Sequence, residues 1–298
     1  MPYKVTRLPG NPIITPQNHP SLGSNLNGPS LIRVPAWVKE PLGRYYLYFA
    51  DHKGKYIRLA YADKLTGLWK IHVPGVLPLA ESHFTDHVAS PEVIIDDERR
   101  QLRLYYHGLT PEERSQHTRV ALSPDGLHFT AIKEPVGKNS AYWRLMHHGN
   151  FWYALAMPGK LWRSKDGLTP FEPGPQLFPN SPTQIHNALW LQKDTLTVFY
   201  TRNGDTPERI LTSKVALGPD WNTWKPSAPE EVLAPERDWE GANLPLVAAH
   251  IGGLEKPERA LRDPAIFQDG KMTYLLYAIA GESGIAIAEL LRFSSALQ

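Results

Sequence analysis

The stretch Arg262–Leu290 reads RDPAIFQDGKMTYLLYAIAGESGIAIAEL, a short apolar strand, a turn, an aromatic strand, a glycine-containing turn and a strand of small residues. Four earlier stretches repeat this arrangement: Asn27–Ala62, Ala89–Gly126, Tyr142–Gly167 and Ile185–Val215. Repeats at about 40–70 residues, each of three or four strands, are typical of a β-propeller. The sequence therefore predicts an all-β fold, a five-bladed β-propeller that forms a single domain over residues 1–298.

The fifth repeat lacks an outer strand after Leu290. The segment YKVTRLPGNPIIT (Tyr3–Thr15) belongs to no repeat of its own. We expect this N-terminal strand to complete the last blade and close the ring, because closure removes two exposed sheet edges. The connector Lys225–Leu261 is long for a loop, and long ordered loops in compact domains are often functional.

Composition excludes several classes of function. The chain has 298 residues and a net charge of +2, so its overall charge gives no case for a nucleic acid or membrane partner. It has no cysteine, which excludes disulfides, a thiolate nucleophile and a cysteine zinc site. The N-terminal residues MPYKVTRLPG lack the apolar segment of a secretory signal, so we expect a cytoplasmic protein.

Antiparallel pairing brings the start of strand one, the end of strand two and the start of strand three to one face of each blade. The aligned starts of strand one are Gly28, Ser90, Tyr142, His186 and Asp263. Glu92 and Arg144 lie two residues after such a start and are expected to point the same way. The other polar residues expected at this face are His52, Arg58, His107, Arg119, Arg202 and Glu282. The predicted funnel thus combines carboxylates, histidines and arginines.

The strand-one starts RDPAIF, NGPSLI and SPEVII, each followed by an aromatic strand of the YYLY type, resemble the five-bladed propeller glycoside hydrolases. These include arabinanases, β-xylosidases, invertases and anhydrogalactosidases. The resemblance implies an enzyme that uses an Asp base on the first blade, a pKa-tuning Asp on the second and a Glu acid on the third. Those blades offer Gly28-Pro29, Glu92 and residues 142–144 here, and only the fifth keeps Asp263-Pro264. The usual trio is therefore not in its usual places.

Glycoside hydrolysis needs a proton donor and a base or nucleophile. The catalytic candidates are Glu92, His186, Asp263, His87 and His52. Glu92 has an alternative role as a salt bridge between blades, and Asp263 as a strand-start residue before proline. A second hypothesis is a divalent metal ion held among His52, His87, His107 and His186, although their spacing forms no compact metal motif.

Four arginines, Arg58, Arg144, Arg202 and Arg262, would make the funnel positive. Arginine binds carboxylate and sulfate groups through two parallel hydrogen bonds, which favours an acidic sugar such as a uronate or a sulfated residue. Alternatively, a repeated arginine ties neighbouring blades together. The remaining substrate-binding candidates are Asn27, His107, Arg119, Trp143, Glu240 and Glu282.

The sequence thus predicts a glycoside hydrolase that acts on an oligosaccharide in an axial funnel. One alternative is a His- and Arg-dependent polysaccharide lyase, which would abstract a proton beside a neutralised uronate carboxylate. Another alternative is a sugar-binding propeller without catalysis, which the missing carboxylate at Gly28 favours.

Overall fold

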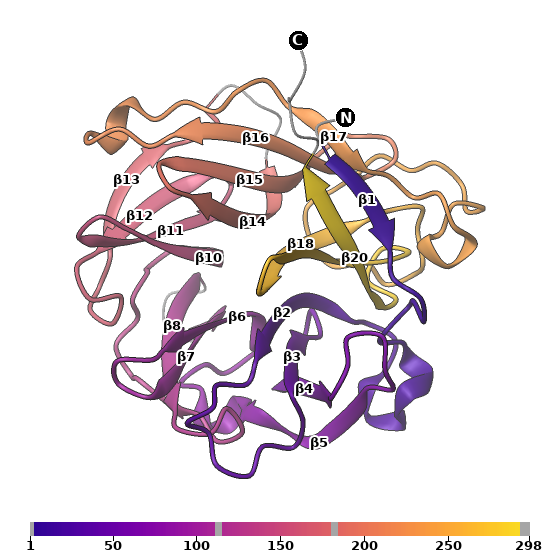
Figure 1. Ribbon diagram of the computed structural model, residues 1–298, viewed down its shortest axis with the longest axis horizontal. Coiled ribbons are helices and arrows are strands. Elements are labelled where there is room, and N and C mark those ends of the chain that lie inside the picture. Colours follow the sequence, from indigo (N-terminus) through magenta and orange to yellow (C-terminus); the bar gives the residue numbers. More distant parts are fainter. Residues whose placement is uncertain (1–2, 111–114, 180–183, 293–298) are drawn as a thin grey trace.

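The computed structural model describes residues 3–110, 115–179 and 184–292. Five four-stranded antiparallel sheets stand around a central axis (Figure 1). The inner to outer strands of blade 1 are β2 (Asn27–Arg33), β3 (Tyr45–Ala50), β4 (Tyr56–Ala62) and β5 (Lys70–Pro78). Those of blade 2 are β6 (Ala89–Asp96), β7 (Gln101–Leu109), β8 (Gln116–Ser123) and β9 (Thr130–Ala131).

Blades 3 to 5 repeat this order. Blade 3 consists of β10 (Ala141–His148), β11 (Phe151–Met157), β12 (Lys160–Ser164) and β13 (Glu172–Gln176). Blade 4 consists of β14 (Gln184–Gln192), β15 (Thr195–Arg202), β16 (Ile210–Ala216) and β17 (Glu230–Leu233). Blade 5 consists of β18 (Arg262–Asp269), β19 (Met272–Ala278), β20 (Ile285–Arg292) and β1 (Tyr3–Arg7). The prediction of an all-β five-bladed propeller is confirmed.

The N-terminal strand closes the ring as expected. Strand β1 pairs antiparallel with β20, with Tyr3 opposite Arg292 and Arg7 opposite Ala288. Figure 1 shows the first and last strands of the chain side by side. Both edges that an open ring would expose are therefore hydrogen-bonded to each other.

The core consists of five apolar clusters, each between two neighbouring blades. Between blades 5 and 1, for example, Leu47 and Ala60 pack with Leu276 and Ile287, and all four are buried. Each sheet is covered on both faces, which is why the middle strands are nearly continuous runs of apolar and aromatic residues.

Helix is limited to 3₁₀ turns in the described residues. These are Pro16–Asn18, Pro20–Leu22, Leu79–Glu81, Trp221–Thr223 and Asp238–Glu240. Within the described ranges, no helix has the length and apolar character needed to cross a membrane.

The connector between β17 and β18, residues 234–261, contacts three blades. The Gly204 amide of blade 4 donates to Ala249 O at 2.7 Å, and Asn25, just before blade 1, donates to Leu254 O at 3.2 Å. In blade 5, Arg262 donates to Gly252 O at 2.8 Å. The connector thus lies beside the mouth of the funnel, at the start of the innermost strands.

Candidate active site

Every innermost strand begins with the same irregularity. The pairing register shifts between Asn27 and Ser30, Ala89 and Glu92, Ala141 and Arg144, Gln184 and Asn187, and Arg262 and Ala265. A bulge breaks the alternation of side chains and re-aims one of them. Five bulges at one end of the funnel therefore gather side chains that a regular strand would direct elsewhere.

Four residues at these bulges have positive φ: Gly28 (59°), Ser90 (47°), Tyr142 (57°) and Asp263 (47°). For a residue with a side chain this conformation costs of the order of 1–3 kcal/mol and is concentrated at functional sites. At Gly28 a Cβ would approach the Cα of Ser90 to 3.1 Å, so blade 1 has little room for the Asp base that the resemblance implied. The Gly28 amide hydrogen-bonds the carboxyl of Asp263, on the neighbouring blade 5.

The alignment of His186 with Gly28 and Asp263 was wrong by one residue. Gln184 pairs with Arg202 and Asn187 with Tyr200, so His186 corresponds to Pro29 rather than to Gly28. The bulge allows its ring to reach the funnel nonetheless, because the side chain after the irregular residue is re-aimed.

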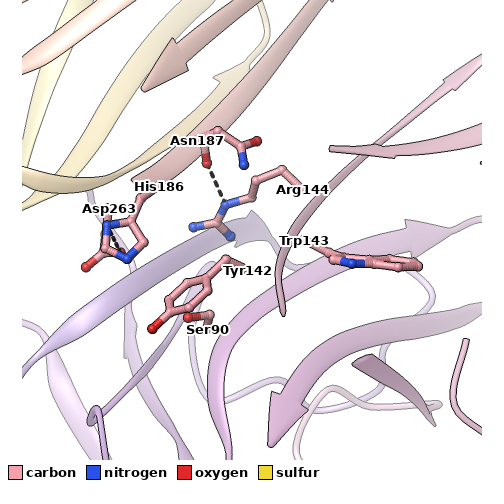
Figure 2. Close-up of a pocket in the computed structure, with 7 residues that line it drawn as sticks. All are labelled: Ser90, Tyr142, Trp143, Arg144, His186, Asn187 and Asp263. Carbon is pink, nitrogen blue, oxygen red and sulfur yellow. Dashed lines mark hydrogen bonds and ion pairs between the residues drawn. The ribbon is translucent and has the colours of Figure 1, made fainter. Parts of the chain in front are cut away.

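His186 and Asp263 form a buried pair at the bottom of the funnel. Nδ1 of His186 lies 3.2 Å from Oδ1 of Asp263, and the two residues are only 6% and 4% exposed. Figure 2 shows them facing each other. In the described part of the chain, neither Nδ1 of His186 nor Oδ2 of Asp263 has a hydrogen-bond partner. The pair therefore retains an acceptor or donor position that a substrate group can fill.

A row of rings extends from this pair to the opposite wall. The ring centroids are 4.8 Å apart for His186 and Tyr142, 4.5 Å for Tyr142 and His107, and 5.9 Å for His107 and His87. At the far end, Nδ1 of His87 binds Oδ2 of the exposed Asp86 at 2.8 Å. Two imidazoles, each with a carboxylate at Nδ1, thus stand at the two ends of the row.

Burial determines how these groups titrate. It raises the pKa of the Asp263 carboxyl, an effect that Arg262 and Arg144 oppose. It lowers the pKa of the His186 and His107 imidazoles well below their usual value. The pKa of the Tyr142 phenol is raised by burial and then by the charges of Asp263 and Glu282. At neutral pH the His186 and His107 rings are therefore uncharged, and the Tyr142 phenol is a hydrogen-bond donor.

The buried histidines predict an acid-dependent loss of stability. The unfolded chain takes up a proton on His107 as the pH falls through about 6.5, whereas the fold keeps the ring neutral because its pKa is lowered. We expect His107→Asn to reduce the decline of the unfolding free energy below that pH by up to about 1.4 kcal/mol per pH unit. Urea unfolding at about pH 7.5 and pH 5.5 measures the decline, and equal declines in both proteins would contradict the assignment.

Glu92 lies behind the funnel, not across it from His186. Its Oε2 binds Nη1 of Arg144 at 2.6 Å, and the same guanidinium donates to the carbonyls of Pro91, Pro29 and Asn187. The Arg144 side chain thus ties blades 1, 2 and 4 to blade 3 and occupies the axis. On its far side Glu92 borders a second axial cavity of about 180 Å³. A sugar on the axis therefore does not fit between Glu92 and His186.

We expect Glu92→Gln to lower stability and to leave turnover near that of the wild type. The change removes the charge partner of Arg144, and the loss of a half-buried ion pair costs about 1–3 kcal/mol. Thermal melts and turnover should be compared with Glu172→Gln, which breaks an exposed pair with Arg163. A tenfold or greater loss of turnover with an unchanged melting temperature would return Glu92 to the catalytic candidates.

The other arginines expected to bind an acidic sugar are also engaged with carboxylates. Arg58 binds Asp51 at 3.1 Å, and Arg202 binds Asp205 at 2.8 Å. Arg262 is fully buried between Glu208, at 2.7 Å, and Glu282, at 3.0 Å. The positive funnel that the sequence predicted is therefore largely neutralised.

Several further candidates support the fold instead of facing the funnel. Asn27 and Glu282 are buried and bind each other at 3.2 Å. The side chain of Trp143 points away from the other pocket residues in Figure 2 and packs against Phe171 between blades. Glu240 is fully buried and binds Arg7 on the outermost strand at 2.7 Å. Their expected roles as substrate ligands are not supported by these positions.

Arg119 also turns into the blade. Its Nε donates to Lys133 O at 2.8 Å, and its guanidinium lies 4.4 Å from the centre of the Phe84 ring. By contrast, His52 lies at the mouth of the funnel with 30% of its side chain exposed, and its Nδ1 is 4.0 Å from Glu282. Of the five catalytic candidates, only Glu92 is separated from the funnel by Arg144.

The histidines do not converge on a single point. The His87 and His107 rings meet edge to face, 5.9 Å apart. Across residues 3–110, 115–179 and 184–292, no three His, Asp or Glu side chains form a group able to hold a metal ion. The metal hypothesis therefore has no ligand set among the described residues.

The sequence reasoning missed Tyr142 and Asp86 as functional candidates. The sequence could have indicated a role for Tyr142, because this bulky residue stands at a repeat position where Gly28 and Ser90 are small. Asp86 directly precedes His87 in the chain, but adjacency alone does not predict a hydrogen bond.

Comparison with known proteins identifies a relative of similar length. The chain is 36% identical over 324 aligned positions to uncharacterized protein R118 of Acanthamoeba polyphaga mimivirus, an alignment that covers 96% of this chain and 90% of that one. No protein-family model matches the chain.

Solved structures share the fold at low sequence identity. A thermostable family-43 glycoside hydrolase has a TM-score of 0.65 and 14% identity, with 97% of this chain and 95% of that one covered. A GH43 β-xylosidase/α-arabinofuranosidase from a compost microbial metagenome, solved with xylotriose, has a TM-score of 0.64 and 12% identity, with 99% and 97% covered. For a putative glycoside hydrolase of Parabacteroides distasonis the TM-score is 0.66 and the identity 14%, with 97% and 96% covered.

Proposed function

The chain belongs to the same family as the mimivirus protein R118, and from its fold and its site we propose that it cleaves a glycosidic bond in a neutral oligosaccharide. The observation that carries the proposal is the buried Asp263–His186 pair at the bottom of the funnel, with Oδ2 of Asp263 unpaired in the described part of the chain. The propeller glycoside hydrolases that share the fold support this choice of reaction class.

Asp263 is the proposed proton donor to the leaving oxygen. Its raised pKa keeps the carboxyl protonated to a higher pH than that of an exposed aspartate, as a general acid requires. Nδ1 of His186 lies 3.2 Å from Oδ1, and Oδ2 makes no hydrogen bond in the described part of the chain, so we assign the transferred proton to Oδ2. The neutral Tyr142 phenol, held between His186 and His107, donates a hydrogen bond to the sugar.

His87 is the proposed base that activates water. Its Nδ1 is bound by Asp86, which leaves Nε2 to accept a proton. His107 and Tyr142 stand between His87 and His186 in the row of rings, so the two proposed proton-transfer groups are held apart along this row. Direct attack of water on the sugar needs an acid and a base that are held apart to leave room for that water.

A neutral sugar is favoured over an acidic one. The four arginines on which the acidic-sugar hypothesis rested all bind carboxylates: Arg58, Arg144, Arg202 and Arg262. A lyase also needs a cation that neutralises the uronate carboxylate. Because these four arginines already bind carboxylates, the lyase alternative is weakened as well. A cytoplasmic location stays a prediction from the sequence.

The test is a screen of the purified protein against neutral and uronate-containing oligosaccharides. We expect new reducing ends from a neutral substrate without the ultraviolet absorbance of an unsaturated uronate. Absorbance from a uronate substrate would establish the lyase instead. Binding without turnover of any substrate would establish a sugar-binding propeller and refute the proposed hydrolysis.

A further inference from the structure

A further cavity opens at the mouth of the funnel, between blade 1 and the connector. It has a volume of about 420 Å³ and is lined by Asn25, residues 51–53 and residues 253–255. This volume lies within the range of small-molecule sites, about 300–1,000 Å³. The funnel floor around Asp263 has room for little more than one water-sized group, about 10 Å³. Most of a saccharide that reaches Asp263 therefore lies outside this small space.

His52 connects this cavity to the proposed reaction centre. Its ring lines the cavity, and its Nδ1 lies 4.0 Å from Glu282, whose carboxylate binds the Arg262 guanidinium. Arg262 is in turn the chain neighbour of Asp263. A ligand in the cavity would thus be linked to Asp263 through His52, Glu282 and Arg262.

Hydrogen bonds hold both walls of the cavity in place. Arg58 binds Asp51 at 3.1 Å, and the His52 amide donates to Asn25 at 2.9 Å. On the connector side, Asn25 donates to Leu254 O at 3.2 Å. Arg262 binds the preceding part of the connector through Gly252 O at 2.8 Å. Arg262, which holds this wall in place, is therefore adjacent to Asp263 in the chain.

Gly253 lets the connector touch His52. A Cβ at this position would lie 2.4 Å from the nearest atom of the His52 ring, closer than real side chains approach. The φ of Gly253 lies outside the left-handed region, so an alanine is strained there by the contact and not by the backbone. The close approach of Gly253 to His52, which only a residue without a side chain permits, thus determines the width of the cavity.

We propose that this cavity is a subsite for a second sugar residue of the substrate, which makes the substrate at least a disaccharide. The inference rests on the proposed function. The carboxylates of Asp51 and Glu255 accept hydrogen bonds, the Lys53 ammonium donates them, and the His52 ring offers a flat face. The cavity lining thus carries both hydrogen-bond acceptors and donors, and both negative and positive charges. Such a lining suits the hydroxyl groups of a neutral sugar better than it suits an anion.

The experiment compares saccharide binding to Gly253→Ala with the wild type. The probes are neutral trisaccharides built from xylose, arabinose, glucose, mannose or galactose, with the five monosaccharides as counterparts, and the method is ligand-observed NMR. We expect the trisaccharide that binds the wild type to bind Gly253→Ala about tenfold more weakly, the effect of one or two lost hydrogen bonds, because the new methyl displaces His52. Binding of the monosaccharide should be unchanged.

Gly218→Ala is the matched control, because no atom lies within 4 Å of its added Cβ and its φ is also outside the left-handed region. It should bind both probes like the wild type. If Gly253→Ala does not fold, Lys53→Ala replaces it, with a smaller loss of trisaccharide binding expected. Equal trisaccharide binding by the wild type and the cavity variant overturns the subsite.

Turnover measured in parallel separates this inference from the proposed function. Weakened trisaccharide binding in Gly253→Ala, with no reducing ends from the wild type, supports the subsite and refutes hydrolysis. Turnover by the wild type that Gly253→Ala leaves unchanged supports hydrolysis and overturns the subsite. Binding of none of the trisaccharides to the wild type overturns both.

Discussion

Asp263→Asn should reduce kcat/KM by about 10²–10⁴-fold and leave the fold intact. The amide keeps the shape of the carboxyl but cannot donate the proton that we assign to Oδ2. The contact with Nδ1 of His186 can persist through the amide, so the row of rings stays in place. The measurement is steady-state kinetics on the substrate found in the oligosaccharide screen, with circular dichroism to verify folding.

The control for this variant is Asp269→Asn, at the other end of the same strand. Asp269 binds Tyr45 at 2.6 Å and Arg33 at 2.8 Å, on the face away from the funnel. It should lower stability slightly without changing kcat/KM. Near wild-type activity of Asp263→Asn would remove Asp263 from the mechanism, while the fold assignment would stand.

The largest expected effect on stability follows from Arg262→Met. Arg262 is fully buried and binds both Glu208 and Glu282. Even with the Arg262 guanidinium beside it, burial raises the pKa of Glu208 to about 7. Removing the guanidinium leaves two buried carboxylates without their cation, and the loss of one partner from a buried ion pair costs about 3–5 kcal/mol. The hydrogen bonds to the connector carbonyls of His250 and Gly252 are lost as well.

Urea unfolding measures this loss of unfolding free energy, with Arg33→Met as the control. That variant breaks the pair of Arg33 with Asp269, in which the Arg33 side chain is 53% exposed, and should cost no more than about 1 kcal/mol. Adding Glu208→Gln to Arg262→Met should recover part of the stability, because one uncompensated buried charge is removed. Where Arg262→Met does not fold, Arg262→Lys keeps the charge and should show an intermediate loss. Equal losses from Arg262→Met and Arg33→Met would show that the buried charges are not coupled.

The architecture could be predicted from the sequence because the information is local and repeated. Alternating and aromatic strands at a regular spacing predict blades, and a spare strand at Tyr3–Thr15 predicts closure of the ring. The same reasoning placed His52, His87, His186 and Asp263 at one face, because antiparallel pairing fixes which strand ends meet there.

The composition of the site was decided only by the tertiary structure. Each of the four arginines expected to make the funnel positive meets a carboxylate, and Arg144, for example, binds Glu92 from another blade, a pairing that no local pattern encodes. A bulge at the start of each innermost strand shifts the register, which displaced His186 by one position in the alignment and directs Trp143 into the core. The sequence by itself therefore determined the ring and the face that the site occupies. Contacts between blades decided which charges remain free for chemistry, because a buried charge is retained only with a partner, and that partner is brought close only when the ring closes.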